Sequence, residues 1–220
     1  MSQSRGGPKG GSVTIGQAGN LALVAAIGYF LGSVPSGLLI GRWLRGIDVR
    51  TIGSGRTGAT NVMRGLGPRG FILTFASDTA KAVLAVLLGG MIAADPEILV
   101  IGQSLGGLAA IVGHNWSIFI RFSGGRGVAC SFGAMLVLYW QGALAGIIIA
   151  AIVIALTRYV SLGSLVGTIG GLLVTTGGVA LFSAALPLAA FAGACAVIVI
   201  VQHRDNIDRL FRGTERRIGG

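Results

Sequence analysis

Long stretches without charge alternate with short charged segments along this chain. Residues 11–41, 127–157 and 159–202 contain no Asp, Glu, Lys, Arg or His. A helix needs about 20 apolar residues to cross a bilayer, so each stretch is long enough to do so. The pattern therefore predicts an all-α fold, a polytopic bundle of membrane helices.

The charged segments predict how this bundle is oriented. Basic residues gather in the segments 42–69 and 121–126, at Arg158 and from His203 onward, whereas the turn at residues 95–97 is acidic. Cytoplasmic loops of membrane proteins carry an excess of Lys and Arg. If the basic segments are cytoplasmic, the N-terminus lies outside and the C-terminus lies in the cytoplasm.

About seven transmembrane helices follow from this orientation, because each stretch that joins two basic segments must cross an even number of times. Five is the alternative, if residues 127–157 only re-enter the membrane. The expected spans are residues 18–41, 71–94 and 97–120, two short helices in 127–157 that break near 140–142, and two helices in 159–202 that divide near 183–187.

The composition agrees with a membrane protein and changes the meaning of the net charge. The mean hydropathy is +0.81, and only 11% of the residues are charged, which is too few to cover a soluble globule. A net charge of +10 would suggest nucleic acid in a soluble protein, but here the basic residues flank apolar stretches. They set topology and meet anionic membrane lipids, so no nucleic-acid partner is expected.

Two further expectations concern the ends and the cysteines. Residues 1–17 are polar and rich in Gly and Ser, so we expect a flexible tail there and a single domain over residues 18–220. Cys130 and Cys195 lie in apolar segments without metal-ligand spacing. We interpret both as packing residues, and we expect no disulfide, no metal and no cofactor.

A cluster of Gly, hydroxyl and amide residues at 53–61 has the chemistry of an oxyanion cradle. Its glycines allow backbone N–H groups to approach a bound group closely. Side-chain donors are added by Ser54, Thr57, Thr60 and Asn61. Six arginines surround the segment with Asp48 as the local acid, which makes phosphate the natural guest: Arg42, Arg45, Arg50, Arg56, Arg64 and Arg69.

Further polar segments would share the cytoplasmic face with this cradle. Residues 122–127 form a second Gly-rich basic loop, which opens the next helix at the positive end of its dipole and gives a second anion site. His203 and Asn206 are three residues apart and share one helix face. Ser161, at the start of a span, is a candidate too, although serines at helix starts are usually caps.

Polar residues also occur at membrane depth. Asp78 and Lys81 are spaced to pair on one helix face, and each ionised group costs about 2.5–3.5 kcal/mol at the bilayer centre. A structural ion pair and a direct role in substrate binding are both open. We interpret His114 as a packing residue rather than a catalyst. Gly and Pro at 32–37 are expected to kink or unwind the first span.

In this order, the segments resemble the bacterial acyl-phosphate:glycerol-3-phosphate acyltransferase family of membrane enzymes. The resemblance implies seven helices in the bacterial plasma membrane, with the active site on the cytoplasmic face. It also implies acyl transfer from an acyl phosphate to the 1-hydroxyl of glycerol 3-phosphate. Lysophosphatidic acid and phosphate would result, as the first step of phospholipid synthesis, downstream of an enzyme that forms the acyl phosphate. The motifs that carry the resemblance are at 32–37, 52–62, 78–81, 113–114, 124–129, 158–161 and 203–206.

Loop chemistry and resemblance together give the expected site. The sequence shows no Ser-His-Asp or Cys-His set, so no covalent acyl-enzyme is expected. The proton of the attacking hydroxyl would pass to the substrate's own phosphate or to His203. Catalytic roles are expected for Ser54, Arg126, His203 and Asn206. Substrate binding is expected from Gly53, Gly55, Arg56, Gly58, Thr60, Asn61, Arg64, Lys81, Gly124, Gly125, Gly127 and Ser161.

Three residues depart from the family's usual pattern. Arg56 replaces Asn, Arg126 replaces Lys and Ala82 replaces Gly. Arg keeps the charge of Lys but changes its reach and hydrogen-bond geometry, so a divergent paralogue with reduced activity is one alternative. A second alternative is an organic-phosphate transporter, which the broken helices and arginine-lined loops would also suit.

Overall fold

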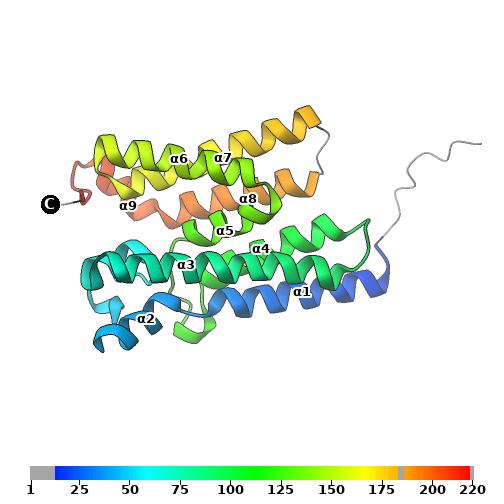
Figure 1. Ribbon diagram of the computed structural model, residues 1–220, viewed down its shortest axis with the longest axis horizontal. Helices are drawn as coiled ribbons and strands as arrows, with labels where there is room; N and C mark the ends of the chain where they lie inside the picture. The colour runs from blue at the N-terminus through cyan, green and yellow to red at the C-terminus, as the bar shows by residue number, and fades with distance from the viewer. Residues whose placement is uncertain (1–12, 183–185, 219–220) are drawn as a thin grey trace, which may run out of the picture.

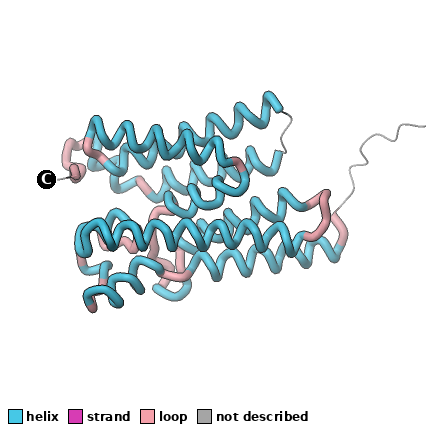
Figure 2. Tube along the Cα trace, in the orientation of Figure 1, coloured by secondary structure: helices cyan, strands magenta, loops and turns pink. Residues whose placement is uncertain are grey.

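The protein is all-helical in the part that the structure, a computed structural model, describes: residues 13–182 and 186–218 (Figures 1 and 2). This confirms the predicted fold class. The helices are α1 (Ile15–Ser33), α2 (Ser36–Arg45), α3 (Ala59–Ala93), α4 (Leu99–Asn115), α5 (Val128–Leu138), α6 (Trp140–Thr157), α7 (Val160–Phe182), α8 (Leu186–Gln202) and α9 (Arg204–Phe211), with short 3-10 turns at Val49–Thr51 and Ile118–Ile120.

Two groups of helices face each other across α5 (Figure 1). Helices α1, α3 and α4 pack together on one side, α6 packs along α7 on the other, and α8 contacts both α4 and α7. The shared core is made of small and medium apolar side chains, among them Ala82, Val86, Ile111, Cys130, Ala134, Phe191 and Cys195. Helices α2 and α9 lie at the same end of the bundle, and the loops that form the site gather there (Figure 1).

Glycines let the helix backbones approach closely. A Cβ on Gly32 of α1 would overlap the backbone of Ala110 in α4, and one on Gly89 of α3 would overlap the backbone of Gly102. Gly146 of α6 likewise faces the backbone of Gly167 in α7. Such small-residue contacts are the usual way in which membrane helices associate, because lipid supplies no hydrophobic drive between them.

The membrane-helix prediction is confirmed, and the total of seven spans stays a prediction. Four helical segments are long and apolar enough to cross a bilayer, and a fifth is added if α8 and α9, bent by 58°, count as one. Helix α4 has 17 residues and the apolar α5 has 11. The four are Ile15–Arg45, Ala59–Ala93, Trp140–Thr157 and Val160–Gly178.

The predicted helix breaks are present. Helix α1 ends at Ser33 and α2 begins at Ser36, with Pro35 between them, so the first span is interrupted where Gly and Pro predicted a kink. Helix α6 begins at Trp140, one residue after the break from α5. A further break separates α7 from α8. It matches the predicted division near 183–187, of which residues 183–185 lie outside the described part.

Two predicted boundaries are wrong. The basic loop was expected to run to Arg69, but α3 begins at Ala59 and continues past a break at Gly67, whose φ is 70°. Pro68 disfavours a helical residue before it, and glycine accepts the left-handed backbone there at little cost. The tail was expected to reach residue 17, but α1 begins at Ile15 behind a capping box between Thr14 and Gln17. Residues 1–12 of that tail lie outside the described part.

Candidate active site

The first Gly-rich loop is held in shape by Asn61. Gly53 and Gly55 adopt left-handed backbone with φ of 54° and 69°, a conformation that glycine adopts without strain. The Asn61 side chain accepts a hydrogen bond from the Ser54 N–H at 2.8 Å. Its amide donates to the carbonyls of Val49 and Arg56, each at 2.8 Å. Asn61 therefore uses its polar atoms to fold the loop around Ser54.

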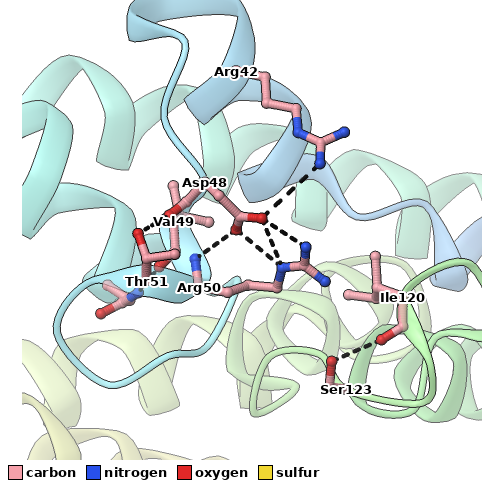
Figure 3. A network of polar contacts seen from close by, with 8 residues as sticks. Arg42, Asp48, Val49, Arg50, Thr51, Ile120 and Ser123 are labelled. Carbon is pink, nitrogen blue, oxygen red and sulfur yellow. Dashed lines mark hydrogen bonds and ion pairs between the residues drawn. The ribbon is translucent and has the colours of Figure 1, made fainter.

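Asp48 precedes this loop in the chain and pairs with Arg42 and Arg50 (Figure 3). Its carboxylate accepts hydrogen bonds from the backbone and side chain of Arg50, with the shortest contact at 2.6 Å, and lies 4.0 Å from Arg42. The hydrogen bond from the Arg50 side chain lowers the pKa of Asp48 to about 2. These two arginines are thus paired with an acid outside the site, whereas Arg56 and Arg64 line its cavity.

The second Gly-rich loop lies directly beside the first. A Cβ on Gly58 would be 4.0 Å from the Cα of Gly125. The Gly125 N–H donates to the His114 carbonyl at 3.1 Å, and Gly127, with φ of 84°, leads into α5. Burial, followed by repulsion from Arg56, lowers the pKa of Arg126 to about 10. Its buried Nε has no hydrogen-bond partner in the described part of the chain, so an anion would relieve both effects.

His203 lies just beyond the last residue of α8, and its ring is held in one tautomer. Its Nδ1 is 2.8 Å from the Val199 carbonyl, and a carbonyl oxygen can only accept, so Nδ1 carries the proton. The other nitrogen, Nε2, is then an acceptor. The side chain is buried, with 2% of the residue exposed, and this burial lowers the pKa of His203 to about 4. The imidazole is therefore neutral near pH 7 and able to take a proton.

Glu215 gathers the polar side chains around His203, and the sequence-based prediction missed it. Its carboxylate accepts hydrogen bonds from Ser161 at 2.8 Å, Asn206 at 2.6 Å and Arg209 at 2.7 Å. Although burial raises it, these hydrogen bonds lower the pKa of Glu215 on balance. The available signal was a lone acid in the basic segment after Asp208. Ser161, the start of α7, is thereby tied to α9 and the segment that follows it.

All three segments open onto one cavity of about 1030 Å³, a volume that includes open solvent. The predicted residues that line it are Ser54, Arg56, Gly58, Thr60, Asn61, Arg64, Arg126, Gly127, Ser161, His203 and Asn206. The cavity lining does not include Gly53, Gly55, Lys81, Gly124 or Gly125. The four glycines belong to the backbone that supports the lining loops. The sequence therefore predicted most of the polar surface of this cavity.

Arginines and apolar side chains both line this cavity. Arg56, Arg64 and Arg126 line it, and among the described residues the nearest acid to any of them is Asp205, 4.0 Å from Arg56. Apolar side chains also line it, among them Phe71, Phe75, Ile147 and Ile154. A second, apolar cavity of about 410 Å³ between α5, α6 and α7 shares Val128, Ile147, Ala150 and Ser164 with the first. The site therefore suits an amphiphile with an anionic head.

Asp78, Lys81 and His114 form a buried cluster, and Asp78 and His114 also line the cavity. Atoms of Asp78, His114 and Cys130 that could bind a metal lie within 4.8 Å of one another. The Lys81 ammonium, however, is 2.8 Å from Asp78 and 3.0 Å from His114. A cation thus already stands between two of these groups, and we assign no metal to them. For Lys81 the contacts favour the structural alternative over direct substrate binding.

Comparison with known proteins agrees with this site. The family described as Glycerol-3-phosphate acyltransferase matches residues 22–213. This chain belongs to that family. The glycerol-3-phosphate acyltransferase of Synechococcus sp. (strain CC9902) is 43% identical over 199 residues, which cover 90% of this chain and 94% of that protein. The enzyme of Symbiobacterium thermophilum is 42% identical over 199 residues, 90% of this chain and 95% of that protein.

Solved structures show the same fold. PlsY (YgiH), an integral membrane glycerol 3-phosphate acyltransferase, superposes in its glycerol 3-phosphate form with a TM-score of 0.81 at 31% identity, covering 90% of this chain and 96% of that one. Its lysphosphatidic acid form gives a TM-score of 0.80 at 30% identity, with coverage of 90% and 95%. The predictions of a membrane acyltransferase of this family are confirmed. Membership of the glycerol-3-phosphate acyltransferase family supports acyl transfer over the transporter alternative.

Proposed function

We propose that this acyltransferase moves a fatty acyl group from an acyl phosphate to the 1-hydroxyl of glycerol 3-phosphate. The products are lysophosphatidic acid and inorganic phosphate. The observation that carries the proposal is the cavity itself, which Arg56, Arg64 and Arg126 line together with apolar side chains. Both phosphate groups need cations and backbone N–H groups, and the fatty chain needs apolar surface next to them. An upstream enzyme that forms acyl phosphates would supply the donor.

The two Gly-rich loops are the proposed binding sites for the phosphate groups. Ser54 and the backbone around it would receive one phosphate, with Arg64 at the start of α3 beside it. Arg126, at the entrance to α5, would receive the other. Negative charge builds up on the attacked carbonyl oxygen in the transition state, and guanidinium and N–H groups stabilise such charge in a site closed to water. Holding two anions side by side also orients the hydroxyl toward the acyl carbon.

The proposed reaction is a direct transfer. The 1-hydroxyl oxygen forms a bond to the acyl carbon, the bond from that carbon to the phosphate oxygen breaks, and phosphate leaves with the bonding electrons. The hydroxyl proton goes to the unprotonated Nε2 of His203 or to the departing phosphate. The His203 tautomer and its neutral state support the first route. Asn206 and Ser161, which are fixed by Glu215, would orient glycerol 3-phosphate beside it.

We further propose that the protein lies in the bacterial plasma membrane with this cavity on the cytoplasmic side. The basic loops at that end of the bundle support this orientation. Cysteines placed at exposed Arg204 and at Glu97 would test it with a membrane-impermeant thiol reagent. The Glu97 position should react in intact cells, and the Arg204 position only after permeabilisation. The reverse pattern would contradict the orientation.

The reaction is tested with purified protein, palmitoyl phosphate and radiolabelled glycerol 3-phosphate. Lysophosphatidic acid and phosphate should form in equal amounts, and palmitoyl thioesters should not replace the acyl phosphate. The proposal would be overturned if no lysophosphatidic acid formed at any pH or acyl chain length. Ser54→Ala and Arg126→Ala should each lower the rate at least tenfold. The matched control is Ser104→Ala, because Ser104 lies in α4 and does not line the cavity.

A further inference from the structure

The Lys81 ammonium is surrounded by three acceptors from three different helices or their ends. It lies 2.8 Å from Asp78 Oδ1, 2.9 Å from the Val34 carbonyl and 3.0 Å from His114 Nδ1. The Asp78 oxygen lies off the direction of a hydrogen bond, so this contact is an ion pair. All three side chains are buried. An ammonium group has three N–H donors, and here each has one acceptor nearby.

This arrangement determines which nitrogen of the His114 ring carries the proton. Nδ1 is 3.0 Å from the Lys81 ammonium but 3.4 Å from Asp78, longer than a usual N–H···O hydrogen bond. A protonated ring would also bring two cations within 3.0 Å of each other beside a single carboxylate. Nδ1 is therefore the acceptor, and the ring is neutral with its proton on Nε2.

His114 also contacts and supports the second Gly-rich loop. Its carbonyl accepts the Gly125 N–H at 3.1 Å. A Cβ on Gly125 would overlap Nε2 of the ring, and a Cβ on Gly124 would overlap the His114 carbonyl. The loop can lie this close only because both positions are glycine. The ring and the carbonyl of His114 thus set the backbone immediately before Arg126.

The Lys81 ammonium is also connected indirectly to the first loop, by way of α2. The Val34 carbonyl belongs to the break between α1 and α2, where it accepts the Ser36 N–H at 3.0 Å as well as the Lys81 ammonium. Helix α2 packs against the first loop so closely that a Cβ on Gly37 would overlap the Thr57 carbonyl. Lys81 is therefore connected to both Gly-rich loops, although it does not line the cavity.

We propose that Asp78, Lys81 and His114 are positioning residues that hold the two phosphate-binding loops in register, with His114 acting on Arg126. The network explains why a charged pair is kept in the apolar interior, where ionised groups are costly. Its effect on catalysis rests on the proposed function, because Arg126 is a phosphate ligand there. The tautomer of His114 does not depend on that function and can be measured separately.

The tautomer is tested by ¹⁵N NMR of protein labelled at histidine. The chain has two histidines, so a His203→Gln variant leaves His114 as the single labelled ring. At pH 7 the spectrum should show a protonated Nε2 and an unprotonated Nδ1, and Lys81→Met should shift the Nδ1 signal. A doubly protonated ring, a proton on Nδ1, or a spectrum unchanged by Lys81→Met would overturn the proposal. An inactive wild-type enzyme would contradict the proposed function and leave this result standing.

The positioning role is tested by a double-mutant cycle on kcat/KM. His114→Gln should lower it about tenfold and Arg126→Ala at least tenfold, and the double variant should be within about twofold of Arg126→Ala, because His114 acts through Arg126. Losses that multiply to about a hundredfold would overturn the proposal. Ser104→Ala, a buried hydroxyl change in the same helix as His114, is the control and should combine multiplicatively with Arg126→Ala. If His114→Gln does not fold, His114→Asn is used instead, because the side-chain oxygen of Asn can accept a hydrogen bond where Nδ1 of His114 does.

Discussion

Glu215 accepts a hydrogen bond from the Asn206 side-chain amide at 2.6 Å, and this contact joins the segment after α9 to the cavity wall. The Glu215 side chain is only 5% exposed and is also paired with Arg209. A buried carboxylate with three donors behaves as an organiser, because each donor is held where the carboxylate places it. Asn206 and Ser161 are therefore presented to the cavity in fixed orientations.

Glu215→Gln is expected to lower activity at least tenfold and to destabilise the protein by about 1–3 kcal/mol. The neutral amide cannot pair with Arg209, and its NH₂ group faces donors that need an acceptor. Initial rates and thermal unfolding in detergent measure the two effects. Asp208→Asn is the matched control, because Asp208 forms an exposed ion pair with Arg212 and should change stability by less than about 1 kcal/mol. Equal behaviour of the two variants would contradict the organising role.

His203 should make stability depend on pH below neutrality. Burial holds its pKa at about 4 in the folded protein, against 6.5 for an ordinary histidine. The unfolded chain therefore binds more protons between these values, so stability contributed by the neutral ring is complete above pH 6.5 and is lost as the pH falls toward 4. The loss is on the order of 3 kcal/mol, since one pKa unit corresponds to about 1.4 kcal/mol.

Melting temperatures of the wild type and of His203→Gln between pH 7.5 and 4 measure this effect. The acid-induced decrease should be smaller in the variant, because Gln does not titrate, while other groups such as Glu215 titrate in both proteins. Parallel curves would show that His203 is protonated equally in the folded and unfolded states. Burial would then not lower the pKa of His203, contrary to the prediction.

Local patterns in the sequence were enough to predict the helices and most of the cavity lining. Uncharged stretches and a Pro at position 35 act over neighbouring residues, so the apolar helices and the break after α1 were predictable. Glu215 was not, because its partner Ser161 is 54 residues away in the chain. The sequence also did not show which arginines are available to the site, because the structure is needed to see that Asp48 pairs with Arg50.

Asn61 illustrates a role that residue type alone leaves open. An amide can bind phosphate or fold a loop, and here it bonds three backbone groups. Asn61→Asp keeps the shape but turns two donated hydrogen bonds into contacts between a carboxylate and carbonyl oxygens. We expect a loss of at least 2 kcal/mol in stability and of nearly all activity, because these groups are buried. Unfolding in denaturant and rate measurements give both values.

Thr60→Val serves as the comparison for Asn61. Thr60 lines the cavity beside Asn61, and the described hydrogen bonds that fold the loop do not use its hydroxyl. Its substitution should therefore change substrate affinity more than stability. If Asn61→Asp instead left stability intact and raised only KM, Asn61 would bind substrate directly and the loop would be held by other contacts.

Arg56 is the departure from the family pattern with the largest expected effect on substrate affinity. It lines the cavity, it lies 3.4 Å from the Gln202 side chain, and its nearest described acid, Asp205, is 4.0 Å away and itself exposed. Its charge is therefore weakly compensated, and it repels Arg126. A bound phosphate would be attracted by both guanidinium groups, which favours an added phosphate clamp over an obstruction.

Arg56→Asn should accordingly raise the KM for a phosphate substrate about tenfold, which corresponds to about 1.4 kcal/mol, while kcat changes less. The dependence of KM on salt should become weaker, because one cation fewer faces the anion. Arg42→Asn is the control, since Arg42 is exposed and faces Asp48 outside the cavity. An unchanged KM in Arg56→Asn would contradict the phosphate clamp. A lower KM would mean that Arg56 obstructs phosphate binding, and would favour the divergent paralogue of reduced activity.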